Sequence, residues 1–271
     1  MSQIKVVING AAGRMGTEVV KAVCTDSDLV AVGAIDVVAS TDDHLPLPDG
    51  SDLIPYSADT ADILDRTKPD VMVDFTTHDV TMPAVRCAIR KGVRPVIGTT
   101  GQSALELDEI GALCKEKGVG AFYAPNFSLG AVLMMYLSKL VAKYFDYAEI
   151  IELHHEKKLD SPSGTALATA KDMVEAHGGP FKRTESEKET LADTRGGNYH
   201  GVSVHSVRLL GLLAHQEVIF GSLGQTISIK HDSISRESFM PGVVLAVKEV
   251  MKLDKLVIGL DKLLGLWEKK G

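Results

Sequence analysis

Short apolar runs alternate with amphipathic stretches through the first half of this chain. Residues 4–8 form a compact run rich in β-branched side chains, which predicts a buried strand, and residues 14–23 then carry apolar side chains at helical spacing. A second strand is predicted at 29–35, and strand-then-helix pairs follow at 70–75 and 80–89, 94–97 and 105–114, and 119–123 and 129–141. Strands that alternate with helices predict a parallel sheet covered on both faces.

The second half of the chain has a different pattern. A strand is predicted at 147–154, a helix at 166–176 and a long charged loop at 181–198. Strand-like runs then follow one another without an intervening helix, at 202–209, 217–220 and 226–230. Successive strands of this kind predict a mixed or antiparallel sheet. The tail is predicted to be helical, at 243–250 and again at 256–267.

We therefore expect an α/β chain with a Rossmann-type parallel sheet domain and a second α+β domain that has a mixed or antiparallel sheet. In this prediction residues 1–127 form the first domain, residues 128–240 form the second, and helices within 241–271 return to the first. A length of 271 residues is comfortable for two such domains.

Composition narrows the class of function. Apolar residues make up 45% of the chain and charged residues 24%, as in a globular protein with a real core. The net charge is −7 and the basic residues are scattered, whereas a nucleic-acid partner would require a basic stripe. The longest apolar stretch, 131–137, is far shorter than the ~20 residues of a membrane span. We expect neither nucleic acid nor a membrane as a partner.

The cysteines Cys24, Cys87 and Cys114 are far apart and include no C-x-x-C pair. Free thiols of this kind are typical of a reducing compartment. The first residues show no basic region followed by a long apolar block, so no secretion signal is predicted. The expected location is the cytoplasm.

The first predicted strand runs directly into a glycine turn, residues 10–16 with the sequence GAAGRMG, and then into a helix. Backbone N–H groups at such a helix start can hold a pyrophosphate, and glycine lets the chain approach it closely. The spacing is G-x-x-G-x-x-G rather than G-x-G-x-x-G, and a plain turn between strand and helix would also use glycine.

Asp36 favours the interpretation of the glycine turn as part of a dinucleotide site. It ends the second predicted strand, twenty residues after Gly16, where an acid can accept hydrogen bonds from both ribose hydroxyls. A 2′-phosphate would need a nearby cation, but residues 37–45 contain no Lys or Arg and include Asp42 and Asp43. This charge pattern favours NADH, with NADPH as the second candidate.

Two further segments follow strands of the same predicted sheet. They are residues 98–101, with the sequence GTTG, and residues 124–127, with the sequence APNF. Ligands bind outside the carboxyl ends of parallel strands, so both segments are candidates to border a nicotinamide. Both also fit simple chain punctuation, with Thr100, Ser103 or Ser128 as helix N-caps.

A cluster of chemically active residues lies between 152 and 166. The predicted strand ends in His154 and His155, and histidine is the side chain best able to exchange a proton near neutral pH. A helix is predicted to start just beyond, with Pro162 in its first turn and Ser161 as a candidate N-cap. Its unpaired N–H groups, together with the charge of Lys158, suit a bound carboxylate or phosphate.

Two other interpretations of this cluster stay open. His154, His155 and Glu156 are possible metal ligands, although adjacent histidines on a strand do not easily converge on one ion. A polar strand end followed by a solvated Lys157-Lys158 pair would explain each residue singly. We expect no metal, because no H-x-x-x-H pair or cysteine partner lies nearby.

The sequence from Glu152 to Ala166, ELHHEKKLDSPSGTA, resembles the signature of the dihydrodipicolinate reductase family. Other blocks similar to that family follow in order along nearly the whole chain: VINGAAGRMG, DFT at 74–76, GTTG, PNFS, HSVR at 205–208, and the stretch 235–239. Many members carry a basic residue directly after the strand-end acid, whereas this chain has Val37.

The resemblance implies hydride transfer from NAD(P)H to C4 of a cyclic dicarboxylate, with a proton delivered at C3, in the diaminopimelate route to lysine. It implies that His154 is the acid/base and Lys158 a second proton donor, while His155, Gly164 and Thr165 hold substrate carboxylates. It also implies a homotetramer formed through the second domain, and a first domain that holds the cofactor with Gly10, Ala11, Ala12, Gly13, Arg14, Met15, Asp36, Gly98, Thr99, Thr100, Ala124, Pro125, Asn126 and Phe127.

Two other functions share part of this pattern. Short-chain dehydrogenases share the G-x-x-G-x-x-G spacing but need a Tyr-x-x-x-Lys pair, and no tyrosine here has a lysine four residues later. A non-catalytic sensor of nicotinamide nucleotides would bind the cofactor without transferring hydride. The presence of His154, Lys158 and the Ser-Gly-Thr segment favours an enzyme.

Overall fold

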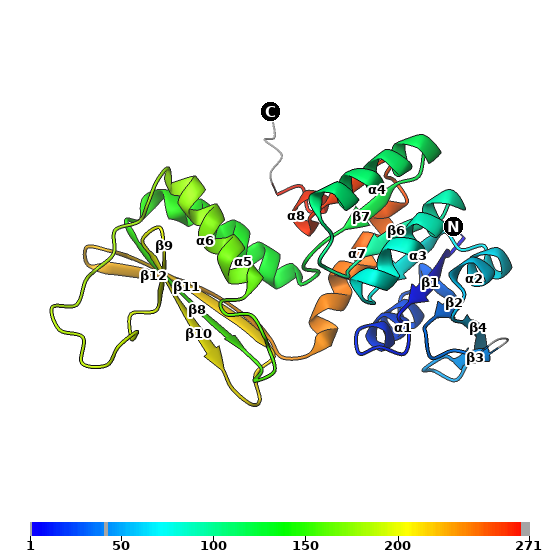
Figure 1. Cartoon of the computed structure of the whole chain (residues 1–271), viewed down its shortest axis with the longest axis horizontal. Helices are drawn as coiled ribbons and strands as arrows, with labels where there is room; N and C mark the ends of the chain where they lie inside the picture. The colour runs from blue at the N-terminus through cyan, green and yellow to red at the C-terminus, as the bar shows by residue number, and fades with distance from the viewer. Residues whose placement is uncertain (1, 41–42, 267–271) are drawn as a thin grey trace. The chain divides into compact units, whose positions relative to one another are not determined.

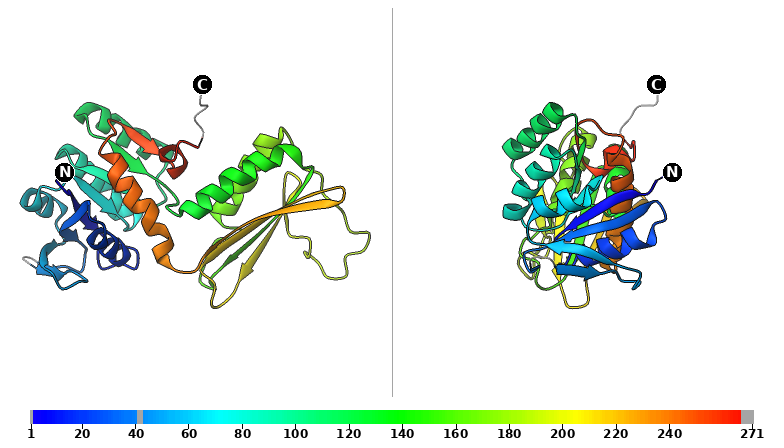
Figure 2. Two further views of the ribbon diagram at one scale, coloured as in Figure 1. Left: turned by 180° about the vertical axis from the view of Figure 1, so that it is seen from behind. Right: turned by 90° about the vertical axis from the view of Figure 1, so that its right-hand side faces the viewer.

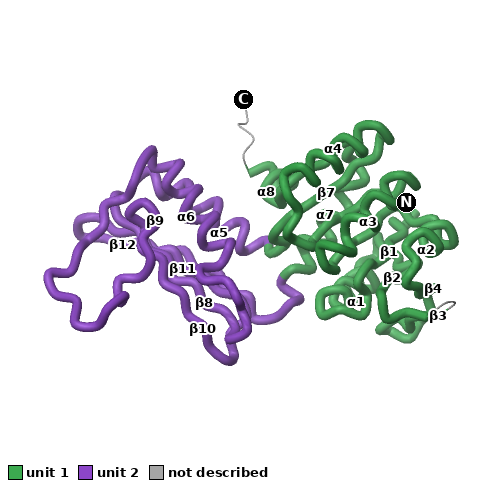
Figure 3. Tube along the Cα trace, in the orientation of Figure 1, with its two compact units in different colours: residues 1–128, 239–271 green, residues 129–238 purple. Residues whose placement is uncertain are grey.

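The computed structural model describes residues 2–40 and 43–266. The chain divides into two compact units, drawn in green and purple in Figure 3. Unit 1 comprises Met1–Ser128 and Phe239–Gly271, and unit 2 comprises Leu129–Ser238. The chain therefore passes between the units twice, at 128–129 and at 238–239.

Unit 1 is built on an eight-stranded sheet with the order β13-β7-β6-β5-β1-β2-β4-β3 (Figure 1). All neighbouring strands are parallel except β3 and β4, which are antiparallel. The strands are β1 (Ile4–Asn9), β2 (Leu29–Ile35), β3 (Asp43–Pro46), β4 (Leu53–Ser57), β5 (Val71–Asp74), β6 (Arg94–Ile97), β7 (Ala121–Tyr123) and β13 (Leu256–Ile258).

The central strands of this sheet are buried on both faces, as their unbroken β-branched runs predict. Val6, Val7 and Ile8 of β1 are fully buried. The helices of unit 1 are α1 (Gly16–Thr25), α2 (Thr60–Thr67), α3 (His78–Arg90), α4 (Ala104–Lys117), α7 (Met240–Val250) and α8 (Leu260–Leu263).

Unit 2 is built on a five-stranded mixed sheet with the order β12-β11-β8-β10-β9. Strands β8 and β10 are parallel, and the other neighbouring pairs are antiparallel. Its elements are α5 (Leu129–Val141), the 3-10 turn η1 (Ala142–Tyr144), β8 (Tyr147–His154), α6 (Gly164–His177), β9 (Gly197–Tyr199), β10 (Val202–Arg208), β11 (Ala214–Ser222), β12 (Gln225–Ser233) and the 3-10 turn η2 (Arg236–Phe239), which spans the second passage.

Helices α5 and α6 cover one face of this sheet (Figure 2). Alternate residues of β8 face them: Ala148 and Ile150 pack against Ala166, Ala170 and Met173 of α6 in a small core. The next residues in that alternation are Glu152 and His154, so the strand period places a carboxylate and an imidazole on the helix-covered face.

The predicted fold class, a Rossmann-type parallel sheet beside a mixed α+β domain, is confirmed. The helix predicted at 256–267 is wrong at its start, because Leu256–Ile258 pairs in parallel with β7 as strand β13. Gly259 then turns the chain at φ 98°, a value that suits glycine, before α8 begins at Leu260. Position 267 of the predicted helix lies outside the described residues.

Helix α6 begins at Gly164, and its N-cap differs from the predicted one. Its N-cap is Ser163, whose hydroxyl accepts a hydrogen bond from the N–H of Ala166 at 3.2 Å, and not Ser161. Pro162 therefore lies before the helix and not in its first turn. The hydroxyl of Ser163 satisfies a donor deep in the first turn, whereas a cap at Ser161 would have forced helical backbone onto two further residues. Among the described residues no helix has the length and hydropathy needed to cross a membrane.

Candidate active site

A cavity of about 400 Å³ lies in unit 1 at the carboxyl ends of β1, β2 and β5. Five residues of the predicted cofactor set line it: Gly10, Gly13, Arg14, Met15 and Asp36. Sequence reasoning missed the rest of the lining, which includes Ala58, Thr60, Phe75, Thr76, Thr77 and Val80. The residues after β5, 75–77, could have been found, because they follow a buried strand of the same sheet.

The glycine turn packs on itself too closely for side chains. Gly10 has a φ of 86°, and a Cβ on Gly16 would lie 1.9 Å from the carbonyl oxygen of Gly10. The start of α1 is therefore pressed against the end of β1, which places the helix N-terminus at the cavity. These features fit a dinucleotide, since a pyrophosphate binds at such a helix start without a side chain in its way.

Asp36 directly follows β2 and lies beside the glycine turn. Its Oδ2 atom accepts a hydrogen bond from the N–H of Ala12 at 2.9 Å. The carboxylate thus fixes the turn and still offers acceptor positions toward the cavity. Val37, which also lines the cavity, is 73% exposed.

Asp74 connects the end of β1, the turn after β5, helix α3 and the segment after β6 through a buried network. Its carboxylate accepts hydrogen bonds from Asn9, Thr76, Thr81 and Thr99 at 2.6–2.9 Å. Burial raises the pKa of this carboxyl, although each of these donors opposes the rise. The network joins the end of β1, the turn after β5 and the segment after β6, so it fixes the rim of the cavity.

The two other predicted cofactor segments lie at strand ends of the same sheet. Thr99 is buried and its hydroxyl donates a hydrogen bond to Asp74, whereas Thr100 is exposed. A Cβ on Gly98 would lie 2.2 Å from the ring of Phe75, so this glycine is required by packing. The second segment consists of buried Ala124 and Phe127, exposed Pro125, and Asn126, whose Oδ1 accepts the N–H of Ser128.

In unit 2, His154 is bonded to a buried acid. Its Nδ1 lies 2.5 Å from Oε2 of Glu152, which is fully buried. Burial lowers the pKa of His154, as do the cations Lys158 and Arg208, while Glu152 raises it. Burial also opposes ionisation of Glu152, but hydrogen bonds from Arg208, Ser206 and His154 outweigh this and lower the pKa of Glu152.

The turn after β8 carries the other predicted groups. Strand β8 ends at His154, so His155 lies beyond the strand, in the turn. The N–H of Lys158 donates to the carbonyl of His155 at 3.1 Å, and its ammonium donates to Asp160 at 2.7 Å. Both side chains therefore lie on one tight turn that leads to α6.

The N-terminus of α6 completes the group. Ser163 caps the N–H of Ala166 and leaves the N–H groups of Gly164 and Thr165 at the positive end of the helix. A Cβ on Gly164 would meet no atom of the described chain within 4 Å. The helix start therefore has room for an approaching carboxylate, and the Asp160 carboxylate already accepts a hydrogen bond from the N–H of Gly164.

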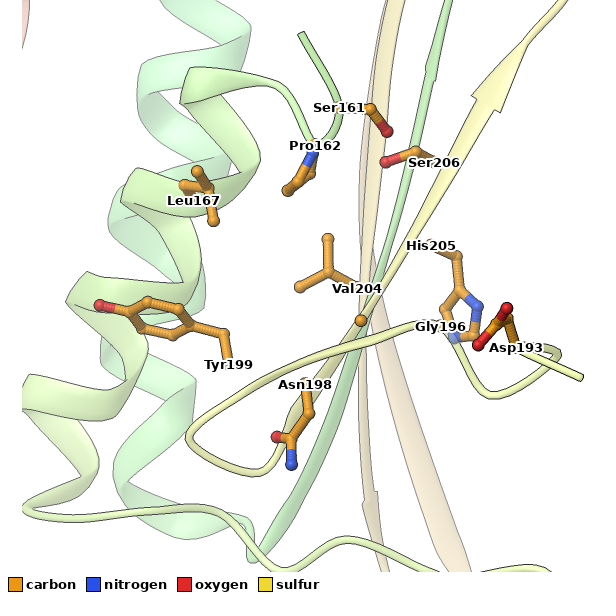
Figure 4. Close-up of a pocket in the computed structure, with 11 residues that line it drawn as sticks. Ser161, Pro162, Leu167, Asp193, Gly196, Asn198, Tyr199, Val204, His205 and Ser206 are labelled. Carbon is orange, nitrogen blue, oxygen red and sulfur yellow. The ribbon is translucent and has the colours of Figure 1, made fainter.

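Figure 4 shows a second cavity in unit 2, of about 590 Å³. Pro162 and Leu167 border it on one side, with Val204 and Ser206 of β10 across from them, and the rest of the lining comes from Asp193, Gly196, Gly197, Asn198, Tyr199, His205 and Ser161. Its lining includes none of His154, His155 and Lys158. This cavity is thus distinct from the turn that carries those three residues.

Within the described part of the chain no three His, Cys, Asp or Glu side chains are grouped so as to hold a metal ion. Cys24, Cys87 and Cys114 are free thiols, and burial raises the pKa of Cys114 to about 11.

Comparison with known families gives two matches that together span most of the chain. The family model described as "Dihydrodipicolinate reductase, N-terminus" matches residues 4–127, and "Dihydrodipicolinate reductase, C-terminus" matches residues 130–264. A 4-hydroxy-tetrahydrodipicolinate reductase from Dehalococcoides mccartyi strain 195 is 54% identical over 98% of this chain and 100% of its own length. The reductase from Bacillus subtilis strain 168 is 48% identical over 96% and 98%.

Solved structures agree with this result. Dipicolinate-bound dihydrodipicolinate reductase from Paenisporosarcina sp. TG-14 superposes with a TM-score of 0.85 at 39% identity, covering 96% of this chain and 99% of that one. An amine dehydrogenase from Mycobacterium smegmatis has a TM-score of 0.66 at 15% identity, which shows a shared fold alone.

Proposed function

Because the chain belongs to the dihydrodipicolinate reductase family, we propose that its two units divide the reaction, with the nucleotide held on unit 1 and the dicarboxylate on unit 2. The chain is an NAD(P)H-dependent 4-hydroxy-tetrahydrodipicolinate reductase of the diaminopimelate route to lysine. Its curated relatives are reductases, which favours this function over a non-catalytic sensor.

The nucleotide is proposed to bind in the cavity at the glycine turn. The helix start at Gly16 would hold its phosphates, and Asp36 would accept the ribose hydroxyls. When bound, reduced nicotinamide supplies the hydride that C4 of the substrate ring accepts. The full set proposed to hold it is Gly10, Ala11, Ala12, Gly13, Arg14, Met15, Asp36, Gly98, Thr99, Thr100, Ala124, Pro125, Asn126 and Phe127.

We propose NADH as the preferred nucleotide. The supporting observation is Asp36 with exposed Val37 behind it, in a segment, 37–45, that has no Lys or Arg to pair with a 2′-phosphate. A carboxylate held at this position also repels a phosphate. NADPH is the second candidate in this proposal, with Arg14 as the basic residue in the lining of this cavity that would pair with its 2′-phosphate.

The dicarboxylate is proposed to bind at the start of α6. The N–H groups of Gly164 and Thr165 would hold one carboxylate, in place of the Asp160 carboxylate to which Gly164 donates in this structure, with His155 and the ammonium of Lys158 as further donors. His154 would exchange the proton at C3 through Nε2, because its Nδ1 is engaged by Glu152, and Lys158 would be the second proton donor. The arrangement of His154, Lys158 and the α6 N-terminus around one turn carries this assignment.

We also propose a cytoplasmic homotetramer that forms through unit 2. Helices α5 and α6 cover one face of sheet β12-β11-β8-β10-β9. Ile151 and Ile219 alternate onto the opposite face and are half-buried there. Sedimentation analysis of the wild type and of Ile219→Lys tests this: a tetramer that dissociates in the variant supports it, and a wild-type monomer contradicts it.

A spectrophotometric assay tests the function. NADH absorbance should fall when the cyclic substrate is generated in place, and should stay constant without it. A chain that binds NADH but never oxidises it in the presence of the dicarboxylate would instead be the sensor.

A further inference from the structure

Glu152 is the most completely enclosed acid of unit 2. Its side chain has no exposed surface, and both of its oxygen atoms are engaged. Arg208 donates to Oε1 at 2.8 Å and to Oε2 at 3.0 Å, the fork geometry that favours a carboxylate. The N–H of Ser163 donates to Oε1 at 3.3 Å, and Nδ1 of His154 lies 2.5 Å from Oε2.

We propose that Glu152, held by Arg208, is a positioning residue that fixes the tautomer of His154 with its proton on Nδ1 and reserves Nε2 for the substrate. The proposal rests on the proposed role of His154 as the acid/base. An ionised carboxylate can only accept hydrogen bonds, so the ring nitrogen beside it must donate. A neutral imidazole has a single N–H, and Nε2 is therefore the acceptor that takes up and returns the proton.

The same pair of residues also organises the rest of the site. Arg208 donates a further hydrogen bond to the carbonyl of Asp160 at 2.7 Å, and the carboxylate of Asp160 accepts from Lys158. Ser163, which begins α6, is bonded to Glu152 through its backbone N–H. One buried ion pair thus connects the imidazole, the lysine turn and the helix start.

Glu152 differs from the other charged groups near the imidazole of His154, because it favours protonation of the ring. Glu152 acts on His154 from the same strand, Arg208 from β10 and Lys158 from the turn. Arg208 and Lys158 are cations and disfavour the imidazolium, whereas Glu152 stabilises it. Removal of the charge at 152 is therefore expected to make His154 harder to protonate.

The substitution Glu152→Gln keeps the shape and reverses the tautomer. If the amide oxygen takes the Oε2 position, its NH₂ group faces two fixed donors, Arg208 and the N–H of Ser163. If the oxygen takes the Oε1 position, the NH₂ group faces Arg208 and His154, and the imidazole can change its role to acceptor. The second orientation leaves fewer opposed donors, so the proton moves to Nε2 of His154.

Nitrogen-15 spectroscopy of histidine-labelled, ligand-free protein measures this directly. The chain has nine histidines, and the signal of His154 is identified by its loss in His154→Ala. We expect an Nδ1–H tautomer in the wild type and an Nε2–H tautomer in Glu152→Gln. We also expect kcat of Glu152→Gln to fall about a hundredfold or more, with its high-pH loss of activity shifted to lower pH.

Glu149 provides a matched control on the same strand. Its carboxylate bonds Arg195 at 2.7 Å and Nε2 of His205 at 2.9 Å. It therefore forms a second Glu–His–Arg group, on the other face of β8 from Glu152. Glu149→Gln should leave the His154 signal, the pH profile and kcat close to wild type. If any glutamate substitution in this strand disturbed the structure, kcat would fall equally in Glu149→Gln and Glu152→Gln.

An Nε2–H tautomer of His154 in the wild type overturns the proposal, and this measurement needs no variant to fold. Unchanged kcat and pH profile in a folded Glu152→Gln protein, checked by its thermal midpoint and NADH affinity, overturn it as well. A wild type that fails to oxidise NADH with the dicarboxylate contradicts the proposed function instead, while the tautomer measurement stands by itself.

Discussion

The carboxylate of Asp36 accepts a hydrogen bond from the backbone N–H of Ala12 at 2.9 Å and so ties the end of β2 to the glycine turn. One acid thereby fixes the shape of the turn and adds negative charge to the cavity beside it. The next residue, Val37, lines that cavity and is largely exposed, so a longer side chain there would not disturb the core.

The first prediction concerns nucleotide preference. Val37→Arg should raise kcat/KM for NADPH by about tenfold or more, because a guanidinium forms charge-assisted hydrogen bonds with a 2′-phosphate, and each tenfold step corresponds to about 1.4 kcal/mol. Val38→Arg is a matched control, since Val38 is 70% exposed and does not line the cavity. A wild type that strongly prefers NADPH would show that the charge argument from Asp36 is wrong.

The second prediction separates chemistry from nucleotide binding. His154→Ala and Lys158→Ala should each lower kcat by about 10²–10⁴-fold, the usual contribution of a positioned acid or base. The dissociation constant of NADH should stay the same, because both residues belong to unit 2 and the nucleotide cavity belongs to unit 1. Lys157→Ala, at an exposed neighbouring position, should retain full activity. Near-normal turnover in either test variant would remove that residue from the reaction.

The third prediction concerns the start of α6. Gly164→Ala should raise KM for the dicarboxylate by tenfold or more, because the methyl group enters the space through which a carboxylate reaches the helix N–H groups. Folding should not suffer, since this methyl group meets no described atom within 4 Å. Gly111→Ala in α4 is an equally open glycine of unit 1, and it should leave KM unchanged. Equal KM values in the two variants would place the substrate elsewhere.

Much of the fold follows from local sequence pattern. The elements Leu29–Ile35 and Leu129–Val141 have the limits predicted, and for the strand the reason is that Asp28 and Asp36 bound its apolar run at both ends. The segment Leu256–Ile258 was misassigned because three residues carry no period, and their pairing partner, β7, lies far away in sequence. Whether a short segment at the edge of a sheet becomes a strand depends on pairing with a strand far away in sequence, and a local pattern does not show that pairing.

The site was predictable to the same extent. His154, Lys158 and Gly164 lie in one contiguous segment, so sequence alone could group them. The roles of Glu152 and Asp74 were missed, although strand alternation puts Glu152 on the same face as His154. Their partners are the reason: Arg208 is 56 residues from Glu152, and Thr99 is 25 residues from Asp74.

The fourth prediction tests the buried network of unit 1. Asp74→Asn should lower the free energy of unfolding by about 1–3 kcal/mol, because an NH₂ group replaces a carboxylate oxygen that accepts two hydrogen bonds, and the donors that faced it must turn or lose their partner. NADH affinity should fall as well, since the network holds the cavity rim at Asn9 and Thr76. Asp70→Asn, just before the other end of β5, is the control and should leave NADH affinity unchanged. If Asp74→Asn is destabilised but binds NADH as the wild type does, the network contributes to stability and not to nucleotide binding.

The fifth prediction concerns pH dependence. Burial lowers the pKa of His154 in the ligand-free protein, and Lys158 and Arg208 lower it further. A bound dianionic substrate adds negative charge beside the imidazole and therefore raises its pKa. If the imidazolium delivers the proton, activity is lost as pH rises through this pKa, and kcat must lose activity at higher pH than kcat/KM does. Both pH profiles should be measured together with a solvent isotope effect, which shows whether proton transfer is rate-limiting. The residual activity of His154→Ala should lack the high-pH loss. A kcat limb at lower pH than the kcat/KM limb, or the same limb in His154→Ala, would assign the proton to another group.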